Sequence, residues 1–504
     1  MKLSRSTIDR ISSSSVELPK AEYFSFSEKV LQFGTGVLLR GLPDYFIDKA
    51  NKQGLFKGRI VVVKSTGSGD LDSFRQQDNL YTCCVRGLAN GELQEELSVN
   101  ASISRVIAAK DHWADVLDCA ANAELQVIIS NTTEIGIQLS SDDIGASPPI
   151  SFPGKLLAFL YRRYQYLGGS TASGMVIIPT ELLPDNGKKL LEIILQLGKQ
   201  HNLEESFLGW LKDGNHWCNS LVDRIVPGKM PPADQQKLSR LLGYEDELMI
   251  MAETYRLWAI ESAGTRVKEI LSFAEADAGI VIAADIHIFR ELKLRLLNGS
   301  HTLSCGLAHL AGFTTVKHAI ADRGFYHYTS SLMLQEITPA IVGGDLTEKM
   351  ATDFAAKVLD RYANPYLDHK WLSITLQYSS KMRSRDLPLL VSYQQRFSSL
   401  PPLMTLGWAA HILFMKCTQG PDGAYFGEYN GNRYAIEDDQ AHFYAAQWAA
   451  PGLPVQAVLS NKAFWGIDLS AIPGFTEAVS NDLQYLQQRG ARALLEELVA
   501  ATIK

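Results

Sequence analysis

The sequence predicts a doubly wound α/β domain followed by a mostly α-helical domain. Two observations predict this order. Over the first half of the chain, short runs of β-prone apolar residues alternate with stretches of helical spacing, which is typical of a parallel sheet with crossover helices. After about residue 285 the apolar residues follow helical stripes, and no further strand-like run is found.

The first βαβ unit begins after a polar, serine-rich start. Residues 29–33 (KVLQF) form a β-prone run that stops at Gly34-Thr35-Gly36. Residues 37 to about 53 have helical spacing, and residues 59–63 (RIVVV) form the next apolar run. A strand, a helix and a strand in close succession predict two parallel strands of one sheet.

The remaining elements follow the same patterns. Further strands of the first half are predicted at residues 125–130, 174–178 and 278–283, with a helix at 188–201. Helices of the second half are predicted at 345–362, 477–486 and 491–503. We therefore expect a flexible segment at residues 1–20, the α/β domain at 21–285 and the helical domain at 286–504.

Composition and charge exclude several classes of protein. Of 504 residues 46% are hydrophobic, which is globular composition. The 48 Lys and Arg against 55 Asp and Glu give a net charge of −7 and no electrostatic reason to bind nucleic acid. There is no membrane-spanning apolar run, no signal-peptide core and no CxxC among six cysteines. We therefore expect a cytoplasmic protein. No Cys/His cluster has the spacing of zinc ligands, so we expect no metal. Because the net charge is negative, a small anionic ligand would need a local basic pocket.

The glycine turn after the first predicted strand lies where a dinucleotide-binding fingerprint belongs. Gly34 would permit the tight turn, and Gly36 would let backbone amides approach a pyrophosphate. Leu39 stands where the third glycine of GxGxxG is expected, so the alternative is a turn that only reverses the chain. Arg40 would either reach a phosphate oxygen or be a solvated helix residue.

The end of the second predicted strand leaves the choice between NAD and NADP open. An acidic residue usually binds the ribose there, but this chain has Lys64, which would tolerate a 2′-phosphate. Asp70 and Asp72 are nearby acidic candidates. Tyr45 and Lys49 form a YxxxK pair, which we interpret as an accident of helical composition because it lies in the first helix.

Three polar residues of different chemistry lie close together at the start of the helical half. At about 100° per residue, Lys293, Asn298 and His301 of one predicted helix would face one cleft. They suit carbonyl/alcohol interconversion: Lys293 would exchange the proton, Asn298 would donate to a developing alkoxide and His301 would orient a hydroxyl. The alternative is a surface lysine, a turn-forming Asn-Gly and a satisfied buried histidine.

A second basic segment provides a candidate site for an acidic ligand. Lys381, Arg383 and Arg385 lie at i, i+2 and i+4 in a serine-rich region. Arginine offers two parallel hydrogen bonds to a carboxylate, so Arg383 and Lys381 are candidates for substrate binding. The alternative is a solvated basic loop.

These motifs together resemble the mannitol dehydrogenase family of zinc-independent, polyol-specific long-chain dehydrogenases. The sequence KLRLLNGSH, with Lys293, Asn298 and His301, is similar to the catalytic signature of that family. The glycine turn with Arg40, the VDRI segment at 222–225 and Asn364-Pro365 match in the same order. The resemblance extends from about residue 29 to at least residue 390. Within the family, SNTTE at 130–134 resembles the branch that acts on the uronate tagaturonate.

The resemblance implies a Rossmann-type domain, a helical domain and an active site between them, in a family whose members are often monomers. It implies reversible hydride transfer from NADH to tagaturonate, which gives altronate. Lys293 would be the general acid or base, Asn298 and His301 would position the oxygen, and Asp223 would belong to the substrate site. The implied cofactor-binding residues are Phe33, Gly34, Thr35, Gly36, Arg40, Asn131 and Thr132.

Some positions depart from the family pattern or stay open. Leu182 replaces an asparagine that donates to the substrate oxygen in relatives, which leaves Asn298 as the surer donor. Glu181 would contact either the substrate or the surrounding protein. Glu134 would either close the strand end near the nicotinamide or cap a turn.

Two alternatives to this function stay open as well. The chain would act on fructuronate or on a polyol such as mannitol, or it would be a non-catalytic nucleotide-binding sensor.

Overall fold

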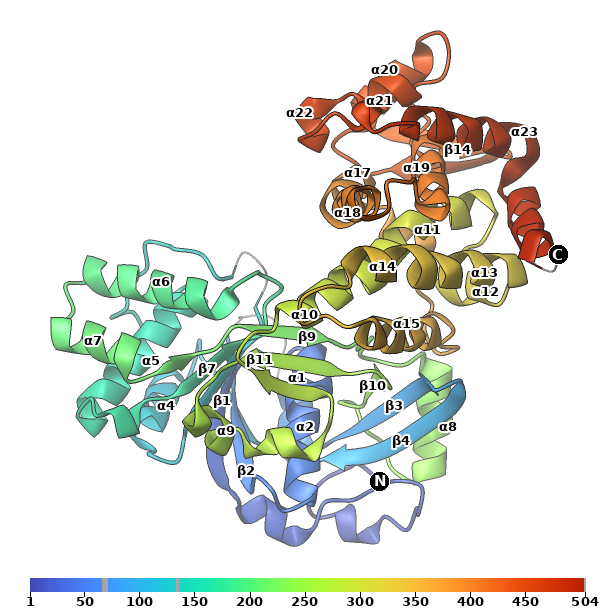
Figure 1. Ribbon diagram of the computed structural model, residues 1–504. Coiled ribbons are helices and arrows are strands. Elements are labelled where there is room, and N and C mark those ends of the chain that lie inside the picture. The colour runs from blue at the N-terminus through green and yellow to red at the C-terminus, as the bar shows by residue number, and fades with distance from the viewer. Residues whose placement is uncertain (66–70, 133–135, 503–504) are drawn as a thin grey trace. The chain divides into compact units, whose positions relative to one another are not determined.

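The computed structural model describes residues 1–65, 71–132 and 136–502. It divides into two compact units (Figure 1). The first unit contains Met1–Arg86 and Leu93–Ile286, and the second contains Gly87–Glu92 and His287–Lys504. Asp70 and Glu134, two candidates from the sequence, lie outside the described residues.

A six-stranded parallel sheet forms the centre of the first unit. Its strand order is β5-β2-β1-β6-β7-β8, and every described neighbouring pair is parallel. The predicted Rossmann-type architecture is therefore confirmed. The strands are β1 (Ser27–Phe33), β2 (Gly58–Lys64), β5 (Ile103–Ala108), β6 (Val127–Ser130), β7 (Val176–Pro179) and β8 (His216–Trp217).

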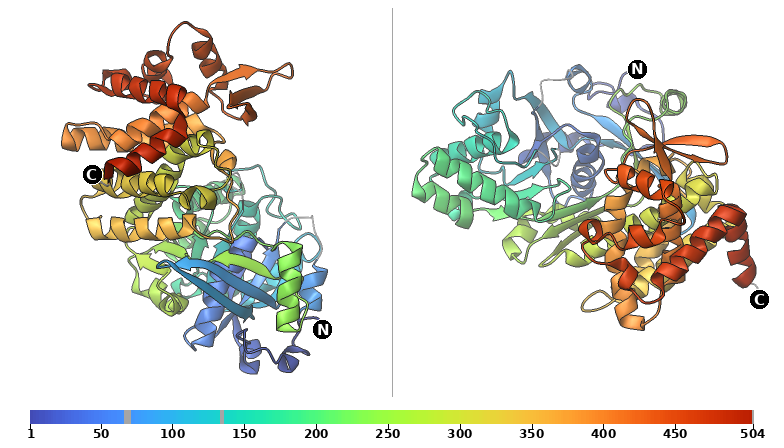
Figure 2. Two further views of the ribbon diagram at one scale, coloured as in Figure 1. Left: turned by 90° about the vertical axis from the view of Figure 1, so that its right-hand side faces the viewer. Right: turned by 90° about the horizontal axis from the view of Figure 1, so that it is seen from above.

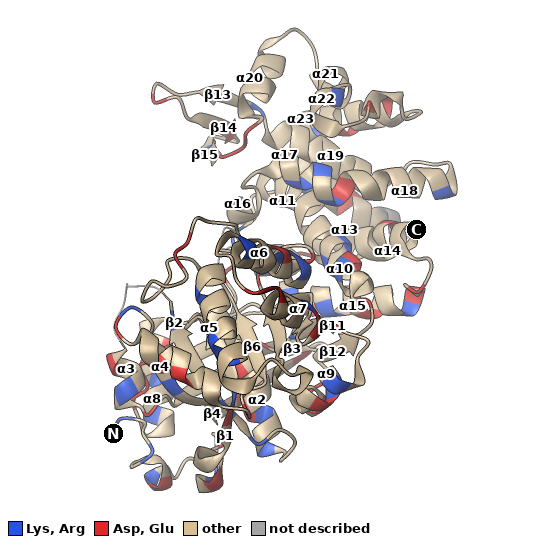
Figure 3. Ribbon diagram, turned by 90° about the vertical axis from the view of Figure 1, so that its left-hand side faces the viewer, with Lys and Arg blue, Asp and Glu red and all other residues tan. Residues whose placement is uncertain are grey.

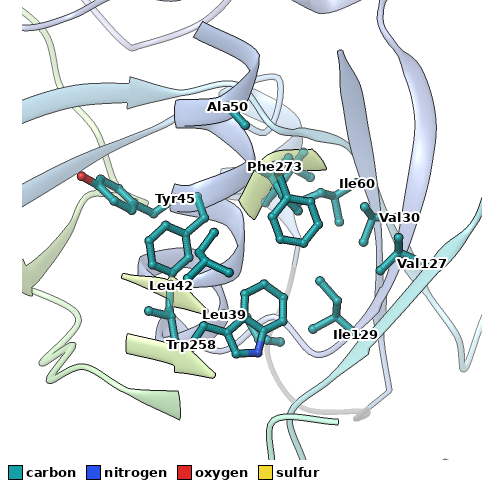
Figure 4. Packing of buried hydrophobic residues seen from close by; sticks show 14 of the residues in the cluster. Val30, Leu39, Leu42, Tyr45, Ala50, Ile60, Val127, Ile129, Trp258 and Phe273 are labelled. Carbon is teal, nitrogen blue, oxygen red and sulfur yellow. The ribbon is translucent and has the colours of Figure 1, made fainter. Parts of the chain in front are cut away.

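Apolar side chains cover both faces of this sheet, because successive residues of a strand point to opposite faces. Val30 of β1 belongs to one buried cluster, which Figure 4 shows with Leu42 and Trp258. Leu31 and Phe33 of the same strand belong to a second cluster. The helices of this unit are α1 (Val37–Gly41), α2 (Pro43–Lys52), α3 (Asp72–Gln76), α4 (Trp113–Asp118), α5 (Phe152–Leu167), α6 (Asn186–Gln200), α7 (Glu205–Asp213), α8 (Pro232–Leu242) and α9 (Thr265–Ile270).

The first helix differs from the expectation of one continuous helix from residue 37 to about 53. It breaks at Leu42, whose φ of −133° and ψ of −79° are not helical. Pro43 follows at the first position of α2, where its missing N–H costs nothing. The break therefore reflects the restriction that proline places on the residue before it.

Two three-stranded sheets complete the first unit, except that the tip of the β3–β4 hairpin, Gly87–Glu92, is assigned to the second unit. The predicted strand at 278–283 is present as β12, but it pairs with β11 in a separate sheet and not in the six-stranded one. The orders are β10-β3-β4 and β12-β11-β9. Their strands are β3 (Tyr81–Ala89), β4 (Glu92–Asn100), β9 (Ser220–Asp223), β10 (Ile250–Glu253), β11 (Leu257–Glu261) and β12 (Ile280–Ala283).

The first twenty residues pack against the first unit, which contradicts the expectation of a flexible segment. Leu3 is fully buried, and its N–H donates to Glu245 O at 3.0 Å. Glu17 pairs with Ser98 in an isolated β-bridge. The expectation rested on the serine-rich composition of this segment and overlooked four spaced apolar residues. These four residues are buried: Leu3, Ile8, Ile11 and Val16.

Helices dominate the second unit, as predicted. Three π-helical segments, Leu292–Gly299, Leu332–Ile337 and Met382–Asp386, interrupt them. The helices are α10 (His287–Glu291), α11 (Ser300–Leu310), α12 (Val316–Ile320), α13 (Arg323–Ser331), α14 (Thr338–Ile341), α15 (Glu348–Tyr362), α16 (Trp371–Ile374), α17 (Tyr378–Lys381), α18 (Leu387–Phe397), α19 (Pro402–Phe414), α20 (Ala441–Ala449), α21 (Val455–Leu459), α22 (Lys462–Trp465) and α23 (Phe475–Thr502).

The last helix, α23, contains a sharp change of direction. Gly490 has a φ of 83° inside it, a conformation that favours glycine. The part after Gly490 passes close to α13: a Cβ placed on Gly324 would lie 2.6 Å from Leu495 O.

The second unit also contains a small antiparallel sheet, which the sequence analysis missed (Figure 2, orange arrows). Its strands are β13 (Cys417–Gln419), β14 (Tyr425–Tyr429) and β15 (Asn432–Ile436). Asn430 and Gly431, with φ of 51° and 78°, form the turn between β14 and β15. The expectation of no strands after residue 285 was therefore wrong. Asn-Gly between two strands is a strong hairpin signal, and this signal was present in the sequence but overlooked.

Candidate active site

The segment that carries Lys293 and Asn298 is π-helical, and α11 begins directly after it. A π-helix has more residues per turn than an α-helix, so the angles expected for one regular helix do not hold here. Lys293 and Asn298 are half-buried, and His301 on the first turn of α11 is 9% exposed. Single-turn π segments are frequent at functional sites, which makes this a site of interest.

The His301 ring is fixed by aromatic neighbours. It stacks on Tyr362 with ring centroids 4.1 Å apart, and it meets the edge of His369 at 5.4 Å. Tyr362 is itself anchored, because its hydroxyl lies 2.8 Å from Ser300 Oγ and donates to Leu297 O. His301 Nε2 is buried without a hydrogen-bond partner among the described residues. A fixed imidazole with an unpaired nitrogen is suited to receive a polar ligand group.

The pKa of His301 is lowered well below its usual value of 6.5. Burial is the largest cause, followed by the electrostatic interaction with His369 and by the positive charges of Arg361, Arg385 and Lys381. The imidazole is therefore neutral near pH 7. It can donate or accept a hydrogen bond there without carrying charge.

Folding gathers four basic residues around His301, which we call the basic cluster: Arg361, His369, Lys381 and Arg385. Arg361 is buried at the end of α15, and His369 precedes α16. Lys381 at the end of α17 donates from Nζ to Ile374 O at 2.8 Å. Lys and Arg are otherwise interspersed with Asp and Glu along the chain (Figure 3). The cluster is thus a local positive site in a protein of net charge −7.

Arg383 does not belong to this cluster, which corrects one candidate from the sequence. Its side chain is exposed, and its guanidinium lies 5.8 Å from the centre of the Phe464 ring. Arg385, two residues later, is half-buried and its Nη1 donates to Thr302 Oγ1 at 3.1 Å. Residues two apart on a helical segment do not face the same side, so only one of the two arginines can reach the site.

The glycine turn of the first unit lies at the carboxyl end of β1. Gly34 has a φ of +129°, and a Cβ there would lie 2.9 Å from Leu39 Cδ1 and 3.1 Å from Asn131 O. A Cβ on Gly36 would meet no atom within 4 Å, and Gly36 is exposed. Phe33 is buried directly before the turn and Thr35 is half-buried within it. The first glycine is needed by the fold, whereas the second leaves open space.

The strand order reverses at β1 and β6. From β1 the chain continues outward through β2 to β5, and from β6 it continues in the other direction through β7 to β8. The glycine turn follows β1, and Asn131 and Thr132 follow β6, so both flank this switch point. Ligands of open α/β sheets bind in the crevice at such a point. The open space at Gly36 and this position fit a dinucleotide.

Arg40 has a structural role and does not extend toward a phosphate site. It is 9% exposed, and its Nη1 donates to Leu248 O at 2.6 Å. Its guanidinium also lies over the ring of Tyr81, 5.3 Å from the ring centre. The expected phosphate contact from Arg40 is therefore contradicted by its position.

Glu181 makes structural contacts with β6 and the residue after it, which is one of the two roles that the sequence left open. It is 2% exposed and accepts hydrogen bonds from the Thr132 N–H at 2.8 Å and from Ser130 Oγ at 3.1 Å. Burial raises its pKa, and these hydrogen bonds act in the opposite direction. Leu182 is 59% exposed, so it fills no position in the core. Asn131 Nδ2 donates to Thr180 Oγ1, which fixes the loop after β6.

Three further candidates have clear positions in the first unit. Asp223 is buried at the end of β9. Tyr45 and Lys49 serve the fold: the Tyr45 hydroxyl donates to Glu96 at 3.3 Å, and Lys49 forms a 2.6 Å ion pair with Asp277. The YxxxK pair is therefore structural, as interpreted from its place in the sequence.

The sequence analysis missed Arg361, Tyr362 and His369, and it did not select Arg385. Tyr362 lies on the apolar stripe of α15, where nothing distinguishes it from a core residue. Arg385 was visible in the basic segment, but only the π-helical backbone decides which arginine faces inward. Among the described residues, no group of three His, Cys, Asp or Glu side chains is arranged to hold a metal ion. No helix in the described part of the chain could cross a membrane.

Comparisons with known proteins identify the family. The model of the mannitol dehydrogenase Rossmann domain matches residues 28–271, and that of the mannitol dehydrogenase C-terminal domain matches residues 285–487. The altronate oxidoreductase of Halalkalibacterium halodurans is 36% identical over 92% of each chain. That of Bacillus subtilis is 36% identical over 94% of this chain and 96% of its own.

Two solved structures share the fold. Pseudomonas fluorescens mannitol 2-dehydrogenase, in a ternary complex with NAD and D-mannitol, has a TM-score of 0.70 at 22% identity and covers 99% of this chain and 100% of its own. A substrate-free D-sorbitol dehydrogenase has a TM-score of 0.78 at 18% identity and covers 98% and 100%. The two domain models span most of the chain in the expected order, and on this evidence it belongs to the mannitol dehydrogenase family.

Proposed function

We propose that this chain is an NAD-dependent oxidoreductase that reduces the keto group of tagaturonate and forms altronate, in a reversible reaction of hexuronate breakdown. The observation that carries the proposal is the neutral His301 with an unpaired Nε2, next to Asn298 and inside a basic cluster. A hydroxylated acid matches both properties. The names of the relatives at 34–36% identity support the same choice, since they are altronate oxidoreductases.

The residues proposed to hold the dinucleotide flank the switch point of the parallel sheet. They come from the turn after β1 and the loop after β6: Phe33, Gly34, Thr35, Gly36, Asn131 and Thr132. When bound, the nicotinamide supplies or accepts the hydride. Lys64 at the end of β2 would tolerate a 2′-phosphate, so we choose NAD over NADP on family resemblance and not on this residue.

The proposed proton carrier is Lys293. In reduction its Nζ gives a proton to the oxygen of the former keto group, and in oxidation it takes the proton back. The Asn298 amide donates a hydrogen bond to the same oxygen while negative charge develops on it. His301 Nε2 binds a substrate hydroxyl, and its neutral state at pH 7 makes it an orienting group. We assign substrate contacts to Asp223 and Lys381 as well.

Related functions compete with this proposal. Fructuronate differs from tagaturonate only in stereochemistry, and a solved structure that shares the fold binds D-mannitol. A non-catalytic sensor would not need Lys293, Asn298 and His301 together. We also propose a cytoplasmic monomer; its six free, buried cysteines fit a reducing compartment, and size-exclusion chromatography tests the monomer.

The test is a comparison of substrates with the purified chain. NADH absorbance is followed with tagaturonate, fructuronate and fructose at equal concentrations, and we expect the highest kcat/KM for tagaturonate. Lys293→Ala should lower turnover by about three orders of magnitude or more while NADH binding persists. Near-normal turnover of this variant contradicts the role of Lys293, and a preference for fructose contradicts the substrate.

A further inference from the structure

Arg385 stands out in the basic cluster because its guanidinium is only partly used. Its Nη1 donates to Thr302 Oγ1 at 3.1 Å and to Asn298 O at 3.4 Å. Within the described chain, its Nε and Nη2 have no hydrogen-bond acceptor, and no carboxylate lies within ion-pair distance of it. The side chain is half-buried, so this unused edge is partly withdrawn from water.

Asp386, the next residue in the chain, forms no hydrogen bond or ion pair with Arg385 in the described structure. Asp386 is fully buried, and neither of its oxygens has a hydrogen-bond partner in the described part of the chain. Burial raises the pKa of Asp386 well above its usual value, and the positive charges of Arg385 and Arg295 act in the opposite direction. A half-buried cation without an ion-pair partner is costly, and an anionic ligand would offset that cost.

The neighbours of Arg385 define the chemistry of such a ligand. Arg361 and Lys381 add charge of the same sign near His301. Lys381 donates a hydrogen bond to Ile374 O, which uses one of its donors. The Nε and Nη2 edge of Arg385 can instead donate two parallel hydrogen bonds to one carboxylate. His301 Nε2 lies unpaired in the same cluster and suits a hydroxyl group. The matching ligand is a small hydroxy acid.

We propose that Arg385 binds the carboxylate of the substrate and makes the enzyme select sugar acids over neutral ketoses. The inference rests on the proposed function and deepens it by naming the residue that recognises the acid. Tagaturonate and tagatose differ only at one end of the molecule, where the first has a carboxylate and the second a hydroxymethyl group. A residue that binds the carboxylate end therefore determines whether the enzyme prefers tagaturonate or tagatose, although the reacting carbon is the same in both.

The chain offers a matched control for this role. Arg383 lies two residues away on the same π-helical segment, and its guanidinium is exposed beside Phe464. Arg385→Gln and Arg383→Gln therefore remove the same charge from the same segment on two different sides. Long-range loss of positive charge affects both variants, whereas loss of carboxylate binding affects only Arg385→Gln.

The experiment measures kcat and KM of the full-length enzyme with NADH and either tagaturonate or tagatose. We expect Arg385→Gln to raise the KM for tagaturonate by about thirtyfold or more and to leave the KM for tagatose within about threefold, whereas the lost hydrogen bonds to Thr302 and the Asn298 backbone lower kcat equally for both ketoses. Arg383→Gln should change neither value by more than about twofold. Arg385→Lys keeps the charge but loses the paired bonds, so its KM for tagaturonate should lie between those of the wild type and Arg385→Gln.

The outcomes that overturn the inference differ from those that overturn the function. An unchanged KM for tagaturonate, with equal losses of kcat on both ketoses, would show that Arg385 only holds the Asn298 backbone. Equal effects of the two glutamine variants would show a general charge effect. If Arg385→Gln does not fold, as judged by thermal unfolding, Arg385→Lys decides the question alone. A wild type that prefers fructuronate contradicts tagaturonate as substrate, and fructuronate against fructose then tests Arg385. A wild type that prefers neutral ketoses overturns the inference itself.

Discussion

Arg295 and Arg385 each donate hydrogen bonds to the backbone of the other's π-helical segment. Arg295 Nη1 donates to Arg385 O at 2.6 Å and to Ser384 O at 3.0 Å, and Arg385 Nη1 donates to Asn298 O at 3.4 Å. Each segment therefore supplies the side chain that satisfies carbonyls of its partner. This exchange fixes the backbone on which Asn298 and Arg385 stand.

The exchange predicts that Arg295→Gln impairs the reaction without changing substrate preference. The variant loses the bonds to Ser384 and Arg385 and the 3.0 Å ion pair with Glu291. We expect a loss of about 1–3 kcal/mol in the free energy of unfolding and a fall in kcat that is equal for tagaturonate and tagatose. Lys349→Gln, which removes an exposed ion pair on α15, is the control and should cost less than about 0.5 kcal/mol. A change in preference would contradict a purely positioning role.

The two glycines of the turn after β1 should respond differently to alanine. At Gly34 the φ of +129° and the contact with Leu39 disfavour a side chain, so Gly34→Ala should lower the melting temperature and weaken NADH binding. At Gly36 there is open space, so Gly36→Ala should fold normally and still bind NADH at least tenfold more weakly, because the methyl group occupies the place of the dinucleotide. Thermal unfolding and NADH fluorescence titration measure both effects. Unchanged affinity in a folded Gly36→Ala would place the cofactor elsewhere.

Arg40→Gln distinguishes a structural arginine from a phosphate ligand. The side chain donates to Leu248 O and lies over the ring of Tyr81, so its loss should destabilise the protein by about 1–3 kcal/mol. The affinity of the folded variant for NADH should stay within about twofold of the wild type, as measured by fluorescence titration. A stable Arg40→Gln variant with much weaker NADH binding would contradict the structural role and support the phosphate contact that the position of Arg40 in the motif first suggested.

His411 should make the stability of the protein depend on acidic pH. Burial lowers its pKa to about 3, so the unfolded chain, with a histidine pKa near 6.5, binds the proton more tightly than the folded one. The contribution of His411 to stability is complete above about pH 6.5 and is lost as the pH falls toward 3, by about 1.4 kcal/mol per pH unit. In His411→Phe this loss is absent. Urea unfolding of both proteins between pH 7 and about 4.5 gives the free energy of unfolding as a function of pH. The slopes of the two curves should differ by the amount expected for about one bound proton. Equal slopes would refute the role of His411.

Local sequence patterns were sufficient for the parallel sheet and for the position of the glycine turn, because alternation and helical spacing depend on neighbouring residues. They were sufficient for the hairpin at Asn430-Gly431 too, although that signal was overlooked within a helical half. The N-terminal segment was misjudged because its few apolar residues, such as Leu3, find their partners far along the chain.

The site was only half predictable for a different reason. Lys293, Asn298 and His301 were found by their spacing, but the backbone that carries the first two is π-helical, and periodicity based on α-helices cannot show this. The same limit led to Arg383 where the structure has Arg385. His369 could not be found at all, because it reaches His301 through tertiary packing and not through any spacing in the sequence.

The bend at Gly490 brings the following part of α23 against α13. Beyond it, Leu495 touches α13 so closely that Gly324 leaves no room for a side chain. Cutting the protein before this glycine would remove the segment that packs on α13 and expose the apolar surface beneath it.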